Sequence, residues 1–335
     1  GTIMKKLFAT AFLCSCITLT FAQTLTRDDI TDKGGYAENK LKNAPKKVYI
    51  ASFRTFFHVM ASADASSIGG SYKGNTKTSM TVAISGVDTP DFMEITNAAY
   101  KKFTDDLKAK GYEILTADDA AKSDEYTDWI KKEGGQVSYA QVPGYVSAVP
   151  SGYSYFIKKE TKKGREKSSF LDKSPKISRD LEGAIVIDVN FAFPFLDMKT
   201  ASSNMIGFSS VKAKVDFELG TAFGQDGITP VIYPSMFKFI SSEGMGKDAI
   251  LHVRLKGEGF DIEAPVFKDK KFKEMTAASM NTTPNYYGII FQNNVKVNVS
   301  HYAECDGALY KQEALRVMNE FTDHALTIFY DYAKK

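Results

Sequence analysis

Asp188 and Asn190 are the residues best placed to do chemistry, because they interrupt a run in which apolar residues alternate from 185 to 195. Side chains two residues apart on a strand lie on the same face of a sheet. This polar pair could therefore line a groove, where a carboxylate could serve glycosidic hydrolysis with a second carboxylate distant in sequence. The alternative is that both side chains simply face water, and the strand pattern by itself favours that alternative.

His301, Glu304 and Cys305 form a second group of reactive side chains, close together in the segment 301–305. Cys305 and His301 could act as nucleophile and base, and the three residues together could bind a metal. None of the 4 histidines has the spacing of a metal-binding helix. A small buried cysteine is the simpler interpretation of Cys305. We therefore predict no catalytic residue, no metal site and no cofactor site.

A basic segment at 158–167 contains six lysine or arginine residues and follows Tyr153, Tyr155 and Phe156. A solvated loop is the default interpretation of such a charge run. The segment could also contact an acidic polymer or a lipid headgroup surface, and the aromatic residues beside it are compatible with a binding loop.

Period-two runs of apolar residues predict the strands that position these side chains. The longest runs lie at 185–195, 211–219, 249–255 and 289–299. Apolar residues at three- and four-residue steps predict long helices at 91–110 and 311–333, and a further helix is predicted at 118–132. The predicted fold class is α+β: a mostly antiparallel sheet with two long amphipathic helices packed on one face and water on the other.

Residues 4–22 have the features of a secretory signal peptide. Lys5 and Lys6 precede a short apolar run, and small residues before Gln23 offer a cleavage site. A lipoprotein anchored at Cys16 is the alternative. The formal net charge of +3 falls to +1 without the two leader lysines, which argues against a nucleic-acid partner. We expect an exported protein, periplasmic or extracellular.

The chain beyond the leader divides into a short lead-in and one large domain. Residues 23–46 are polar and are predicted to form a flexible lead-in. Residues 47–335 are predicted to form a single α+β domain. An irregular, partly basic insertion is predicted at about 134–182, where three prolines and several glycines interrupt the regular patterns.

Two segments carry a resemblance to a known group of proteins. They are the strand sequence Lys-Val-Tyr-Ile-Ala-Ser-Phe at 47–53 and the helix from Thr89 with its helix-Gly-strand junction at 107–115. Together they resemble envelope proteins related to the curli secretion subunit and the penicillin-binding-protein activator lipoproteins. The resemblance implies a small exported α/β domain that assembles or binds partners. The chain departs from that group in its weak lipobox at Cys16 and in Thr116-Ala117-Asp118, where the group often has an Asp-Arg pair.

Three functions are compatible with these patterns. The first is a non-catalytic exported envelope protein that binds a protein or an envelope polymer and could associate peripherally with a membrane. The second is a secreted hydrolase with dispersed carboxylates, Asp188 among them; a pocket with clustered carboxylates and raised pKa values would favour it. The third is an outer-membrane secretion or pore subunit, since 185–195 and 211–219 are long enough to cross as a tilted hairpin.

Overall fold

The computed structural model describes residues 23–67, 76–169, 171–203, 208–225, 230–257, 259–262, 266, 274–279, 288–292 and 295–334. The predicted signal peptide at 4–22 and the alternative anchor at Cys16 lie outside these residues. Strands make up most of the regular structure, and most strand pairs are antiparallel, as the period-two patterns predict.

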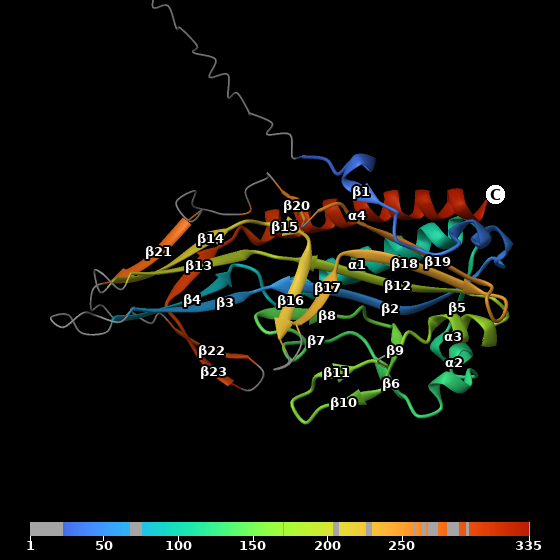
Figure 1. Cartoon of the computed structure of the whole chain (residues 1–335), viewed down its shortest axis with the longest axis horizontal. Coiled ribbons are helices and arrows are strands. Elements are labelled where there is room, and N and C mark those ends of the chain that lie inside the picture. Colours follow the sequence, from blue (N-terminus) through green and yellow to red (C-terminus); the bar gives the residue numbers. More distant parts are fainter. Residues whose placement is uncertain are drawn as a thin grey trace, which may run out of the picture.

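An eight-stranded sheet forms the centre of the molecule (Figure 1). Its strands are β1 (Ile30–Thr31), β2 (Lys47–His58), β5 (Glu113–Leu115), β7 (Val137–Ser138), β8 (Tyr145–Ala148), β12 (Ile185–Phe193), β18 (Met236–Ser242) and β19 (Asp248–Leu255). They lie in the order β1-β19-β18-β12-β2-β8-β7, with β5 also paired to β2. The neighbours β2 and β12 run parallel, so the sheet is mixed at its centre, while β18 runs antiparallel to both of its neighbours, β12 and β19.

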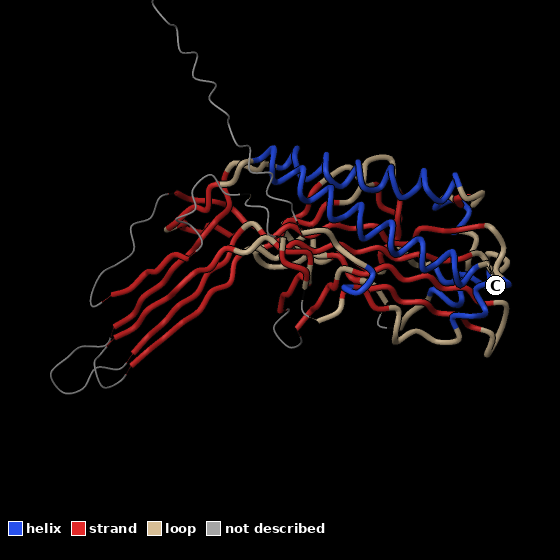
Figure 2. The backbone as a smooth tube through the Cα atoms, turned by 90° about the horizontal axis from the view of Figure 1, so that it is seen from above, coloured by secondary structure: helices blue, strands red, loops and turns tan. Residues whose placement is uncertain are grey.

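Two helices, α1 (Thr89–Ala109) and α4 (Gly307–Ala333), lie along one face of this sheet (Figure 2). Asp88 and Asp91 form a capping box at the start of α1, and Asp306 accepts two backbone N–H bonds at the start of α4. Their apolar stripes enclose the main core against the sheet. Its largest buried side chains include Phe53, Phe103, Phe191, Phe237 and Phe321.

Residues 116–182 cover part of the opposite face and lie below the sheet in Figure 1. The regular elements of this covering layer outside the sheet are α2 (Ala117–Ala120), the 3₁₀ turn η3 (Asp124–Tyr126), β6 (Ile130–Glu133), β9 (Ser154–Ile157), β10 (Lys159–Glu160), β11 (Glu166–Lys167) and α3 (Ser174–Asp180). The predicted helix at 118–132 is wrong, because this segment divides into α2, η3 and β6, and β6 pairs with β9.

A second, smaller core joins the covering layer to the sheet. It is built around Tyr49, Tyr126, Ile177, Val186 and Ile240. The prediction that the whole second face is wet is therefore wrong for this region, because the covering layer supplies apolar side chains that exclude water from it.

Further strands project beyond the sheet as an arm. The arm lies on the side of the molecule opposite the C-terminal end of α4 (Figure 2). One layer of the arm pairs β24 (His301–Glu304), β4 (Thr76–Ser85) and β3 (Met60–Ser67), and the other pairs β13 (Leu196–Ser203), β14 (Phe208–Val215) and β21 (Glu274–Ser279). The segments 185–195 and 211–219 therefore do not pair as one hairpin. β14 pairs with β13 and β21, while β12 lies between β2 and β18.

Three short strand pairs account for the other strands of the described residues. They are β15 (Glu218–Leu219) with β20 (Phe260–Asp261), β16 (Thr221–Gln225) with β17 (Pro230–Pro234), and β22 (Gly288–Gln292) with β23 (Val295–Val299).

The lead-in at 23–46 packs against the body of the protein. It contains η1 (Arg27–Asp29), β1 and η2 (Glu38–Asn43). Leu25, Ile30 and Leu41 are at most 1 % exposed, which differs from the flexible segment expected from its polar composition. A few well-spaced apolar residues are sufficient to attach an otherwise polar segment.

Candidate functional site

The side chains of β12 change from apolar to polar and back again on the sheet face away from the helices. Val186 belongs to the smaller core, and Ala192 belongs to another apolar cluster around Phe56. Asp188 and Asn190 occupy the gap between these clusters. Both line a pocket of about 450 Å³ between the sheet and the covering layer, so they form part of a groove.

Two rows of side chains cross the floor of this pocket. Strand register places a residue of β2 on one side of each β12 residue and a residue of β18 on the other. The rows are Ser52, Asp188 and Lys238, and next to it Arg54, Asn190 and Met236. All six residues line the pocket. The floor is therefore a grid that offers one carboxyl, one amide, one hydroxyl and two cationic groups.

A β-bulge in β2 brings two members of this grid onto the pocket face. The register of β2 against β12 shifts by one residue between Ile50 and Ser52, so Ala51 is the extra residue. Without this shift, Ser52 and Arg54 would share the face of Ile50, under the helices. Bulges commonly occur beside functional sites, where they re-aim side chains. The sequence carries a signal of the bulge, because the core positions of the strand change from even numbers to odd numbers at Phe53.

Aromatic rings contributed by the covering layer form a wall of the pocket. The rings of Tyr126 and Phe156 are stacked with centroids 4.2 Å apart, and the Trp129 ring meets Tyr126 edge-on at 5.2 Å. All three residues line the pocket. Trp129 is the one tryptophan of the chain. The sequence does not reveal this wall, because its pattern predicts a helix at 118–132, which contains Tyr126 and Trp129, and an irregular segment around Phe156.

Asp188 is partly buried and makes no hydrogen bond or ion pair with any residue that the structure describes. Burial raises the pKa of Asp188 to about 6, with a further rise from Asp172 and an opposing effect from Lys238. The ammonium group of Lys238 is itself engaged in an ion pair with Asp172. The carboxyl group of Asp188 is therefore half protonated near pH 6 and accessible to a ligand in the pocket.

The pKa values of two other carboxyl groups in the pocket are lowered, in contrast to that of Asp188. Burial alone would raise the pKa of Asp172, but the hydrogen bond and charge of Lys238 together with the hydrogen bonds from Ser174 outweigh it, and the net pKa shift is downward. Burial acts in the same way on Glu166, and there the charge and hydrogen bond of Arg54 together with hydrogen bonds from Tyr155 and Lys132 make the net pKa shift downward. One carboxyl group with a raised pKa thus shares a pocket with two whose pKa values are lowered, which is a pattern found in acid and base pairs.

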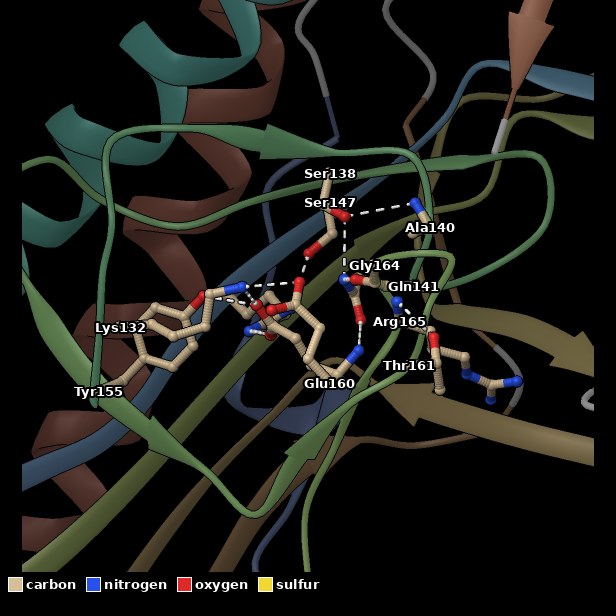
Figure 3. Close-up of polar contacts among 12 residues, drawn as sticks. Lys132, Ser138, Ala140, Gln141, Ser147, Tyr155, Glu160, Thr161, Gly164 and Arg165 are labelled. Carbon is tan, nitrogen blue, oxygen red and sulfur yellow. Dashed lines mark hydrogen bonds and ion pairs between the residues drawn. The ribbon is translucent and has the colours of Figure 1, made fainter. Parts of the chain in front are cut away.

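Glu166 connects the covering layer to the sheet, and two of its partners, Lys132 and Tyr155, are drawn in Figure 3. Its carboxylate accepts hydrogen bonds from Arg54 at 2.5 Å and from the Tyr155 hydroxyl at 2.8 Å, and it pairs with Lys132 at 3.0 Å. The side chains of Arg54 and Glu166 are 14 % and 9 % exposed. Glu166 belongs to the basic segment, so the solvated-loop interpretation is wrong for this residue.

The second group of candidate residues lies away from the pocket lining. Cys305 is fully buried beside the start of α4, and its thiol donates to the carbonyl of Ala303 at 3.9 Å. His301 and Glu304 lie in β24 at the base of the arm. Within the described ranges, the structure holds no group of three or more His, Cys, Asp or Glu side chains suited to a metal ion. Cys305 fits the interpretation of a small buried core residue.

Comparisons of the chain with family models, with curated proteins and with solved structures gave no match. In the part of the chain that the structure describes, no helix is long and apolar enough to span a membrane.

Proposed function

We propose that this protein is an exported, non-catalytic envelope protein that binds a sugar-containing envelope polymer in the pocket at Asp188. In this proposal the two long amphipathic helices stabilise one face of the sheet, and the ligand occupies the other. The observation that supports it most is the pairing of a polar floor with an aromatic wall across one pocket.

Sugar rings suit such a pocket because they have two kinds of surface. Their hydroxyl groups both donate and accept hydrogen bonds, and Asp188, Asn190 and Arg54 can satisfy them with fixed planar groups. Their C–H faces are apolar and pack on aromatic rings such as Trp129. Pockets that bind small polar ligands generally combine apolar walls with a few convergent polar groups.

Trp129 gives a direct test, because fluorescence of this single tryptophan reports on the pocket. Saturable changes in its emission are expected when soluble fragments of envelope polysaccharide are titrated into the protein. Asn190→Ala should weaken this binding at least tenfold, while Asp118→Asn, at an exposed position on the covering layer, should leave it unchanged. An emission spectrum that responds to none of the polysaccharide fractions would refute the proposal.

A secreted hydrolase is the second candidate, and the raised pKa of Asp188 favours it. Asp188 would donate the proton to a glycosidic oxygen, and Asp172 or Glu166 would supply the ionised carboxylate. Such an enzyme would release reducing ends at a rate that declines above about pH 6, and Asp188→Asn would reduce that rate more than a hundredfold. Binding without any release of reducing ends excludes the hydrolase and leaves the first proposal standing.

The projecting arm favours a third candidate, an outer-membrane secretion or pore subunit. Its strands β4 and β14 extend beyond the sheet (Figure 2). Each of them is the central strand of one of the two layers of the arm. Negative-stain microscopy of protein mixed with vesicles should then show ring-shaped oligomers. Protein that stays monomeric and does not float with vesicles rules this candidate out.

Export itself is tested by mass spectrometry of protein recovered from fractionated cells. Cleavage after residue 22 predicts a mature chain that begins at Gln23. A diacylated chain that begins at Cys16 would instead support the lipoprotein alternative.

A further inference from the structure

The hairpin formed by β10 and β11 carries like charges directly opposite one another on both of its faces. Glu160 is in register with Glu166, and Lys159 is in register with Lys167. Because side chains alternate along a strand, the two glutamates share one face and the two lysines share the other. Like charges opposite each other destabilise a strand pair unless a counter-charge joins them.

The protein supplies that counter-charge on the glutamate face. The ammonium group of Lys132 lies 3.1 Å from a carboxylate oxygen of Glu160 and 3.0 Å from one of Glu166 (Figure 3). Arg54 neutralises the second oxygen of Glu166. Both glutamates of this face therefore have cationic partners, and the ion pair with Arg54 also connects the hairpin to the sheet.

The lysine face has no such partner. Lys159 and Lys167 are exposed, and neither forms an ion pair with a carboxylate of the described chain. Lys162 and Lys163 are also exposed, in the turn that joins the two strands. Two opposed lysines repel each other, and an anion bound between them would relieve this repulsion.

The hairpin is held in a fixed position beside the pocket. Gln141, which lines the pocket, accepts a hydrogen bond from the backbone N–H of Glu166 at 3.0 Å and donates one to the carbonyl of Gly164 at 3.1 Å (Figure 3). Ile157 and Ser168, also pocket-lining residues, lie close in sequence to the lysine pair on each strand. Lys159 and Lys167 therefore lie within two residues of the pocket lining along each strand.

We propose that Lys159 and Lys167 bind the anionic groups of the ligand, so that the polymer whose sugar occupies the pocket is an acidic polysaccharide. This inference rests on the proposed function, since it names the class of that same ligand. The recognised groups are carboxylates, phosphates or sulfates borne on a sugar chain. The exposed turn lysines extend the same positive surface, which attracts an acidic chain at low ionic strength.

The test compares two double variants with the same net charge. Lys159→Gln/Lys167→Gln removes the proposed site, and Lys42→Gln/Lys108→Gln removes two exposed lysines elsewhere. On immobilised polygalacturonate, the hairpin variant should elute at less than half the salt concentration that the control variant needs. In parallel, Trp129 emission is titrated with oligogalacturonate and with its neutral methyl ester. The wild type should bind the acidic form at least tenfold more tightly, and the hairpin variant should lose this preference.

The outcomes separate the two proposals. Equal elution of the two variants overturns the lysine site, even where the tryptophan emission responds and the pocket proposal stands. Different elution with unresponsive tryptophan emission overturns the pocket proposal and with it the shared ligand, although the lysines bind anions. Retention on vesicles of anionic lipid, with none on polygalacturonate, overturns the inference in favour of a membrane surface.

Discussion

Asp188 is accessible to a ligand, and its partly buried carboxylate makes the folded protein less stable at neutral pH. Its pKa is raised from 3.8 to about 6 in the folded protein, so the folded state retains a proton that the unfolded chain has released. The stabilising contribution of this residue is therefore fully present below pH 3.8 and is lost as the pH rises through 6. Functional sites often retain such locally unfavourable groups, because function requires them to be accessible.

Replacement of Asp188 by asparagine should therefore stabilise the protein at neutral pH. We expect the free energy of unfolding to increase by roughly 1–3 kcal/mol at about pH 8, because a partly buried charge is removed, and the difference to vanish near pH 4. Urea unfolding across this pH range measures it. Asp118→Asn, whose native side chain is 81 % exposed, should change the free energy by less than about 0.5 kcal/mol. A less stable Asp188→Asn protein at pH 8 would contradict the assigned environment.

His58 has the opposite dependence on pH. Its ring is buried and stacked on Tyr145 with centroids 4.3 Å apart, and its Nδ1 accepts the backbone N–H groups of Phe195 and Leu196 at 3.3 and 3.2 Å. Burial lowers its pKa to about 4. The unfolded chain binds this proton first, so the stability from neutral His58 is present above pH 6.5 and is lost as the pH falls toward 4.

His58→Phe should separate the hydrogen bonds from the titration. At pH 7 we expect a loss of about 1–3 kcal/mol, since two buried N–H groups lose their acceptor. The variant should also lose less stability than the wild type when the pH falls from about 6.5 to 4. His58→Gln, which keeps an acceptor oxygen, serves as the control and should be the more stable variant at pH 7. An unchanged acid response in His58→Phe would show that other groups dominate this pH range.

At the scale of elements, the contacts that attach the first residues of the lead-in to α4 can be tested. The backbone N–H of Leu25 donates to Glu320 at 2.9 Å, and Arg316 donates to the carbonyl of Gln23 at 2.9 Å. The Leu25 side chain is 1 % exposed. Leu25→Ala should cost about 2–4 kcal/mol by leaving a cavity and should speed tryptic cleavage after Arg27.

The matched control for that change is Leu25→Met, which keeps the buried volume and should cost less than about 1.5 kcal/mol. Calorimetry and timed proteolysis provide the two measurements. Equal stability of Leu25→Ala and the wild type would mean that the segment is free in solution, as its polar composition alone suggests.

The elements themselves were largely predictable, because burial on one face imposes a period on the sequence. The alternation from 185 to 195 predicts β12, and the stripe from Phe92 to Leu107 follows the buried side of α1. The helix predicted at 118–132 is wrong, since Thr116 (with Asp119) and Ser123 cap two short turns instead of one helix. The buried positions of β2 change from even to odd residue numbers after Ala51, which indicates the bulge. This change does not identify the partner strand.

At the scale of the whole molecule, the pocket could not be predicted from the sequence, because tertiary structure brings its parts together. Asp188 was recognisable as a polar residue in an apolar strand. Its neighbours Ser52 and Lys238 follow only from the pairing of β12 with β2 and β18. Trp129 reaches the pocket only because the covering layer folds back over the sheet. Side-chain period predicts which face a residue occupies, but strand order decides which residues meet.

The position of the pocket between two layers leads to a final prediction about the whole molecule. A ligand held by the polar floor and the aromatic wall binds both layers at once, so it should suppress their separation. Hydrogen exchange should slow in the segments 124–133, 166–169 and 171–174, because each of them contributes residues to the pocket lining from the covering layer. The arm strands β3 and β14 provide an internal reference and should exchange at unchanged rates. Protection confined to the arm would place the ligand there and would favour a secretion subunit over a polymer-binding protein.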